Sequence, residues 1–215
     1  MQNSKLIDLL KTFEKEDWRW FRKFLLSPYF NNREELVTFC DYLRGQAPDF
    51  KEKAIRKEKV FKKIYPGQKY DEKQISYAMN FLLGQAERFL AQREIETKPP
   101  LINNNLLKSL ADRNLNKHYK YQYDKTQKTL DKWKIDNIDY YSFEFQKSKI
   151  ANSHFITQKL RKYDKHLQNI INSFDEFYGL NKITYSFEML SRSTFLNNAY
   201  MPPSEKEINN LPKIV

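Results

Sequence analysis

Three histidines and one cysteine are the side chains of this 215-residue chain best suited to metal binding or nucleophilic chemistry. His118, His154 and His166 form no i, i+4 pair, and none has the glutamate neighbour of a zinc-protease helix. Structural zinc sites combine Cys and His at recognisable short spacings, which this chain lacks. Cys40 lies among apolar neighbours, as expected of a small core residue. The sequence therefore predicts no metal site and no cysteine nucleophile.

Glycines and acidic residues form no catalytic pattern either. The four glycines, at 45, 67, 84 and 179, are isolated from one another, so no glycine-rich phosphate loop is present. Acid pairs such as Glu34–Glu35 stand at predicted helix starts, where the helix dipole favours negative charge. We therefore expect no catalytic residue and no cofactor, and we interpret the chain as non-enzymatic.

Lysine-rich helix faces are the strongest functional signal in a chain of net charge +11. Tyr121, Lys125, Lys128 and Lys132 recur at i, i+4, i+7 and i+11, opposite the apolar stripe of the same predicted helix. Lysines in such a row contact successive phosphates, and an exposed tyrosine stacks on a base. The alternative is a solvated face that keeps the protein soluble. A second basic cluster includes Arg56, Lys59, Lys62 and Lys63.

The elements that carry these side chains are expected to be helices throughout. Four glycines and eight prolines are few for an all-β protein, while abundant lysine, leucine and glutamate favour helices. An aromatic content of 15% supplies large side chains for burial. No apolar run approaches the roughly 18 residues of a membrane span, and the N-terminal residues lack a signal-peptide layout. We therefore expect a cytoplasmic protein without a membrane span.

Paired prolines divide the predicted helices into two sets. Residues 1–96 are predicted to form a five-helix N-terminal domain, followed by a proline-containing linker over 97–104. Residues 105–200 are predicted to form stacked helical hairpins, and 201–215 a tail or the start of a further helix. The predicted fold is all-α, with antiparallel hairpins stacked in a tetratricopeptide-like or other α-solenoid manner. The tetratricopeptide consensus itself is absent.

The stretch Asn172–Arg192 is predicted to form the last of these hairpins, with its corner at Gly179. This last pair lacks the polar cap that normally closes a helical stack, so one side is expected to meet a partner. The partner would be another protein or another copy of this chain. The residues expected in the core are Phe174, Phe177, Ile183, Phe187 and Leu190. Those expected at the partner surface are Tyr185, Met189 and Phe195.

Three segments of the chain, Leu9–Asn31, Val60–Ile75 and Phe174–Arg192, carry a resemblance to known proteins. They resemble a family of uncharacterised bacterial all-helical proteins that pair a small helical N-terminal domain with a helical-repeat region. The resemblance implies this fold and no activity, and it transfers no functional residue. The hypothesis from the sequence is a non-enzymatic helical scaffold for protein–protein interaction. The alternative is a nucleic-acid-binding protein that uses its lysine-rich helix faces.

Overall fold

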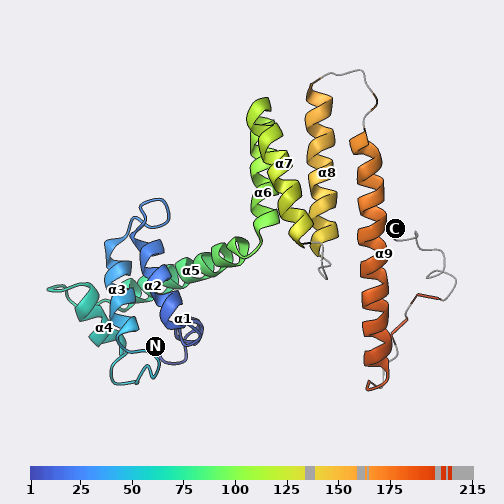
Figure 1. The fold of residues 1–215 in the computed structure, drawn as a ribbon. Coiled ribbons are helices and arrows are strands. Elements are labelled where there is room, and N and C mark those ends of the chain that lie inside the picture. Colours follow the sequence, from blue (N-terminus) through green and yellow to red (C-terminus); the bar gives the residue numbers. More distant parts are fainter. Residues whose placement is uncertain (134–138, 159–162, 164, 197–199, 202, 205–215) are drawn as a thin grey trace. The chain divides into compact units, whose positions relative to one another are not determined.

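The computed structural model describes the chain except for residues 134–138, 159–162, 164, 197–199, 202 and 205–215. Every regular element among the described residues is an α-helix, which confirms the all-α prediction (Figure 1). The chain divides into two compact units, Met1–Glu94 and Ile95–Val215. The helices that begin in the first unit are α1 (Lys5–Leu10), α2 (Lys15–Leu26), α3 (Glu34–Arg44), α4 (Lys57–Ile64) and α5 (Glu72–Glu96). Those of the second unit are α6 (Pro99–Asp112), α7 (Asn116–Trp133), α8 (Asp139–Thr157) and α9 (Lys165–Ser193).

Several helices of the first unit begin at side chains that bond the free backbone amides of the first turn. Ser4 Oγ accepts from the amide of Ile7 at 3.4 Å, at the start of α1. Glu14 and Asp17 form a reciprocal capping box at the start of α2. Asp71 accepts from two amides at the start of α5, at 2.7 and 3.1 Å. Because these contacts are local in sequence, the starting points of these helices are encoded locally.

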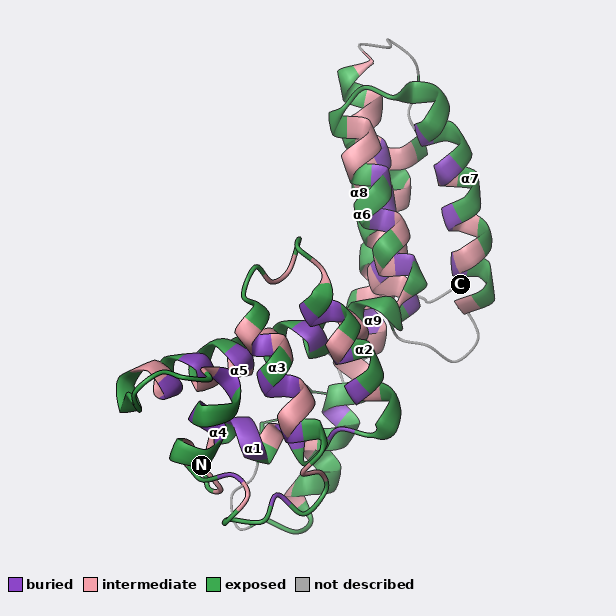
Figure 2. Ribbon diagram, turned by 90° about the vertical axis from the view of Figure 1, so that its left-hand side faces the viewer, coloured by how far each residue is buried: buried purple, intermediate pink, exposed green. Residues whose placement is uncertain are grey.

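An apolar core holds the first unit together. The rings of Phe13, Phe21 and Phe24 all pack against Phe89, with centroid separations of 5.4–5.9 Å. Cys40 is fully buried in the same core, and burial raises the pKa of its thiol to about 12. A protonated, inaccessible thiol is a core residue and not a nucleophile, as the sequence predicts. Figure 2 shows the buried positions of these helices as purple bands on the ribbon.

The second unit is assembled differently. Its four helices run alternately in opposite directions, so sequence neighbours are antiparallel (Figure 1). Its described cluster of buried apolar residues consists only of Leu130, Tyr140 and Phe143, with three partly buried neighbours. Polar side chains fill other buried positions: the Asn104 amide, for example, donates to the carbonyl of Phe143 at 2.9 Å. This unit therefore rests on fewer apolar contacts than the first.

Two boundaries differ from the sequence-based predictions. Helix α9 is continuous through Gly179, which is buried within it, so the predicted hairpin corner is wrong. An interior glycine costs a helix about 1 kcal/mol, too little to end one that packs along its length. Pro99 and Pro100 occupy the first two positions of α6, where a missing N–H costs nothing, so the linker predicted over 97–104 is wrong in extent. Most of the predicted tail at 201–215 lies outside the described residues.

Candidate functional site

Helix α9 exposes a stripe of large apolar side chains along one side. The stripe residues recur at i, i+4, i+7, i+11 and i+18, a spacing that places them within a narrow sector of the helix. Each is between 43% and 59% exposed. Contiguous apolar surface of this kind typically marks an interaction site. The stripe consists of Leu167, Ile171, Phe174, Tyr178 and Tyr185, with half-buried Met189 continuing it.

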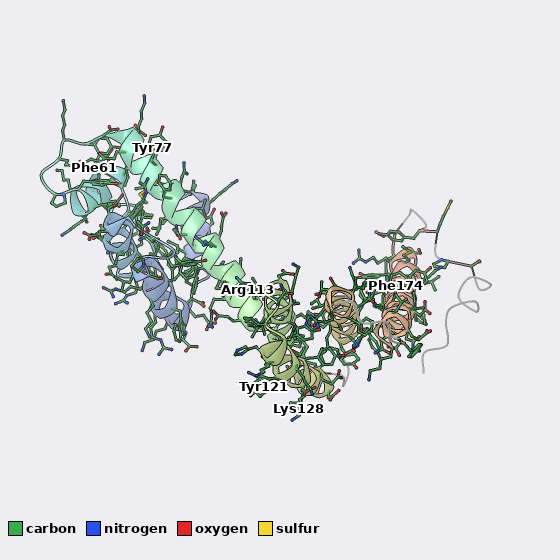
Figure 3. The ribbon with its side chains drawn as sticks, turned by 90° about the horizontal axis from the view of Figure 1, so that it is seen from above. Phe61, Tyr77, Arg113, Tyr121, Lys128 and Phe174 are labelled. Carbon is green, nitrogen blue, oxygen red and sulfur yellow. The ribbon has the colours of Figure 1, made fainter. Side chains whose placement is uncertain are left out.

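Helix α9 also extends beyond its neighbour α8. The rings of Phe145 and Phe174 lie 5.5 Å apart and mark the register of this antiparallel pair (Figure 3). Only six residues of α8 precede Phe145, whereas nineteen residues of α9 follow Phe174. The C-terminal turns of α9 therefore continue past the end of α8, and Phe187 and Leu190 are 69% and 49% exposed.

The core predicted for this region is accordingly wrong. Phe174, Phe187 and Leu190 are exposed, and Phe177 and Ile183 are only half-buried. The prediction assumed a hairpin whose two arms would bury each other. Because the helix does not turn at Gly179, no second arm exists to cover these side chains.

The residues predicted to contact a partner line a groove on α9 in two cases out of three. Tyr185 and Met189 contribute to a cavity of about 410 Å³ whose lining also includes Phe174 and Tyr178. Pro203, from the segment that follows the helix, lies at the same groove. Phe195 is 87% exposed and lies beyond the end of α9, outside the groove lining. The groove thus already accepts one apolar side chain from this chain.

The lysine-rich faces are exposed as the sequence predicts. Tyr121 is 73% exposed, and Figure 3 shows Tyr121 and Lys128 on the same side of α7, pointing away from α8. Lys125, Lys128 and Lys132 are exposed, and none forms an ion pair with a described residue. The second cluster lies at and along α4 in the other unit, also exposed, and comprises Arg56, Lys59, Lys62 and Lys63.

Two of the three histidines line one cavity, of about 320 Å³, between α7, α8 and the start of α9. The imidazole of His154 stacks on the ring of Tyr119, with centroids 3.8 Å apart. Burial, and to a lesser degree the nearby His166, lower the pKa of His154, which is therefore neutral at pH 7. His118 is exposed and lies outside this lining. Among the described residues, no three His, Cys, Asp or Glu side chains come together as metal ligands.

A buried charge between α7 and α8 was not foreseen from the sequence. The side chain of Lys147 is 1% exposed, and its Nζ lies 2.6 and 2.8 Å from the two carboxylate oxygens of Glu144. It also donates to the side-chain oxygen of Gln127 and lies 5.5 Å from the ring centroid of Tyr123. Lys147 shares its helix with an apolar pattern on several sides, so periodicity alone assigns it to no particular face.

These features define an all-α protein of two helical units with an exposed apolar groove on α9 and no evident catalytic constellation in the described residues. None of the protein families, curated proteins or solved structures with which the chain was compared matches it. The resemblance to the uncharacterised helical family is therefore still an expectation. No described helix has an apolar stretch long enough to cross a lipid bilayer. The functional argument accordingly rests on the chain's own residues.

Proposed function

We propose that this protein is a non-enzymatic helical scaffold whose second unit binds an amphipathic helix of a protein partner along α9. The observation that carries the proposal is the exposed stripe from Leu167 to Tyr185 with the groove beside it. Helix-in-groove recognition uses anchors at i, i+4 and i+7, the spacing that the stripe presents. The antiparallel order of α6 to α9 provides the same geometry for one more helix, as in an α-solenoid.

The sparse apolar core of the second unit supports this proposal. Large side chains such as Tyr185 and Phe187 are left in water although buried polar groups occupy positions such as Asn104 and Gln122. Covering a fully exposed side chain of this size contributes about 1.5–3 kcal/mol. A partner helix along α9 would therefore stabilise the complex without any change in the first unit. Aromatic anchors of this kind are typical of interface hot spots.

Photo-crosslinking tests the proposal directly. We expect a photoreactive phenylalanine analogue at Tyr185, in the full chain in cells, to give a covalent adduct of defined mass. The matched control is the same analogue at Tyr77, which is 62% exposed on α5. Adding Ile171→Glu should lower the adduct yield at position 185 by more than about tenfold, because a charge replaces an apolar anchor.

The mass of the adduct identifies the kind of partner. Twice the mass of the chain indicates a second copy, and any other single mass indicates a different protein. Adducts of the same pattern from positions 185 and 77, or no adduct from position 185, would contradict the proposal.

A second candidate function is the binding of single-stranded nucleic acid along α7. The observation that favours it is the row of Lys125, Lys128 and Lys132, exposed and without ion pairs to described residues, beside exposed Tyr121. Its expected signature is a salt dependence of affinity for a labelled oligothymidylate, because bound phosphates release counterions.

Neutralising the three α7 lysines with glutamine is expected to lower the log–log salt slope by about 2, since each phosphate contact contributes about 0.7. The measurement is fluorescence anisotropy across a salt series. Three exposed lysines of the first unit serve as the control set and should leave the slope unchanged: Lys5, Lys15 and Lys73. Equal slopes for both triple variants would rule out this function for α7.

A further inference from the structure

The cavity between α7, α8 and the start of α9 has the size and lining of a small-molecule site. Its volume of about 320 Å³ lies at the lower end of the range of roughly 300–1,000 Å³ typical of ligand pockets. Aromatic rings form much of its wall, from Tyr119, Tyr123 and Phe155 together with the imidazoles of His154 and His166. A cavity of this size fits a ligand of one or two rings.

The rings are arranged to receive a further ring. Tyr123 and His166 meet edge to face, with centroids 6.0 Å apart and planes at 73°. Phe155 and His166 do the same at 6.5 Å and 61°. Aromatic pairs at such separations are favourable in edge-to-face and offset-stacked arrangements. An aromatic ligand therefore gains more from this wall than an aliphatic one of equal size.

One side of the cavity is closed by a hydrogen-bonded group that needs no ligand. The amides of Asn116 and Gln158 bond each other at 3.1 and 3.3 Å. The Oδ1 atom of Asn116 also lies 2.9 Å from Nε2 of His154. These groups hold His154 in place against Tyr119, and their polar atoms are already used. A ligand would therefore find its polar partners elsewhere in the lining.

The Tyr119 hydroxyl is the polar group that lacks a partner. The residue is 7% exposed, and its oxygen has no hydrogen-bond partner in the structure. Burial raises the pKa of this phenol well above its ordinary value, so the group is protonated and available as a donor. Buried hydroxyls in native proteins are normally bonded, and one left without a partner in a cavity wall is suited to a ligand acceptor.

A positive charge stands at the open edge of the same cavity. Lys120 belongs to the lining, is exposed, and forms no ion pair with a described residue. A carboxylate there would make a charge-assisted hydrogen bond at little desolvation cost. The lining thus combines an aromatic wall, one inner donor and one outer cation.

We propose that this cavity binds a small aromatic acid. The ring of the acid packs against Tyr123 and Phe155, and its carboxylate meets Lys120. A hydrogen-bond acceptor on the far side of the ring receives the Tyr119 hydroxyl. The proposal is independent of the groove on α9, since Tyr119 and Lys120 belong to α7 and none of these residues lines that groove.

The probe is 4-hydroxybenzoate, which carries an acceptor and a carboxylate at opposite ends of one ring. Binding to the full chain is followed by amide shifts in NMR titrations. Ligands of this size reach dissociation constants of about 1 mM or tighter in a fitting pocket. Benzoate, which lacks the inner acceptor, should bind about two- to twelvefold more weakly, as expected for one neutral hydrogen bond. The saturated analogue trans-4-hydroxycyclohexanecarboxylate should bind more weakly than 4-hydroxybenzoate because it lacks the ring.

Two variants separate the proposed contacts from a structural effect. Tyr119→Phe should weaken 4-hydroxybenzoate about two- to twelvefold and leave benzoate unchanged, because only the hydroxyl is lost. Lys120→Gln should weaken both acids, whereas Lys117→Gln, an exposed position outside the lining, should weaken neither. Equal affinity for all three compounds, shifts outside the cavity lining, or no saturable binding of 4-hydroxybenzoate to the wild-type chain would overturn the proposal.

Discussion

Replacing Lys147 with methionine is expected to lower the free energy of unfolding of the second unit by about 3 kcal/mol, the lower end of the range for breaking a buried ion pair. The Lys147 side chain is 1% exposed and its partner Glu144 is 17% exposed. The substitution keeps the apolar stem but leaves the Glu144 carboxylate and the Gln127 side-chain oxygen without their donor. A carboxylate that is largely removed from water and has lost its counter-ion is strongly destabilising.

Urea denaturation followed by circular dichroism measures this change, and hydrogen exchange assigns it to α7 and α8. The double variant Lys147→Met/Glu144→Leu should recover most of the lost stability, because a well-packed apolar pair often equals a buried ion pair. Lys149→Met changes an exposed lysine of the same helix and should alter stability by no more than about 0.5 kcal/mol. Wild-type stability of the single Lys147 variant would show that the buried contact is not formed in solution.

Phe21→Ala is expected to destabilise the first unit by about 4 kcal/mol, within the range for truncating a buried phenylalanine. Phe21 is fully buried, and its ring lies 5.5 Å from that of Phe13 and 5.4 Å from that of Phe89. Its removal leaves a cavity among the rings that join α2 to α5. A rigid aromatic cluster collapses only partly into such a space, so the cavity cost adds to the lost burial.

Tryptophan fluorescence provides the measurement, because Trp18 is 4% exposed and meets Phe13 edge to face at 5.5 Å. Tyr77→Ala is the matched control: it truncates an aromatic side chain of α5 that is 62% exposed. We expect its stability to stay within about 0.5 kcal/mol of wild type. Comparable losses for the two variants would mean that the cluster around Phe21 is not the core of this unit.

The two units respond to different forces, and the contrast bears on function. The first unit buries phenylalanines and leucines around one core, as an independent domain does. The second unit spends buried positions on Lys147, Gln122 and Asn104 and leaves Tyr185 and Phe187 in water. Such a unit gains stability when a partner covers its apolar face. The polar contacts between its helices also limit how far the unit can repack by itself.

The helical character of the chain and most inward faces were predictable from the sequence alone. The stripe of Tyr119, Thr126 and Leu130 on α7 is buried, and Tyr121 and Lys128 are exposed on the opposite side. These patterns depend on the 3.6-residue period, which is a property of one helix and needs no knowledge of its neighbours.

Helix ends and the identity of neighbours were decided by the tertiary structure. Gly179 is compatible with a turn and with a helix interior, and the sequence around it does not distinguish the two. Where α8 ends relative to α9 decides whether Phe187 is core or surface, and that register depends on contacts such as Phe145 with Phe174. The pairing of Lys147 with Glu144 and Gln127, and the meeting of His154 with Tyr119, likewise join residues of antiparallel helices. Periodicity specifies which side of a helix is apolar, whereas only packing determines whether another helix covers it.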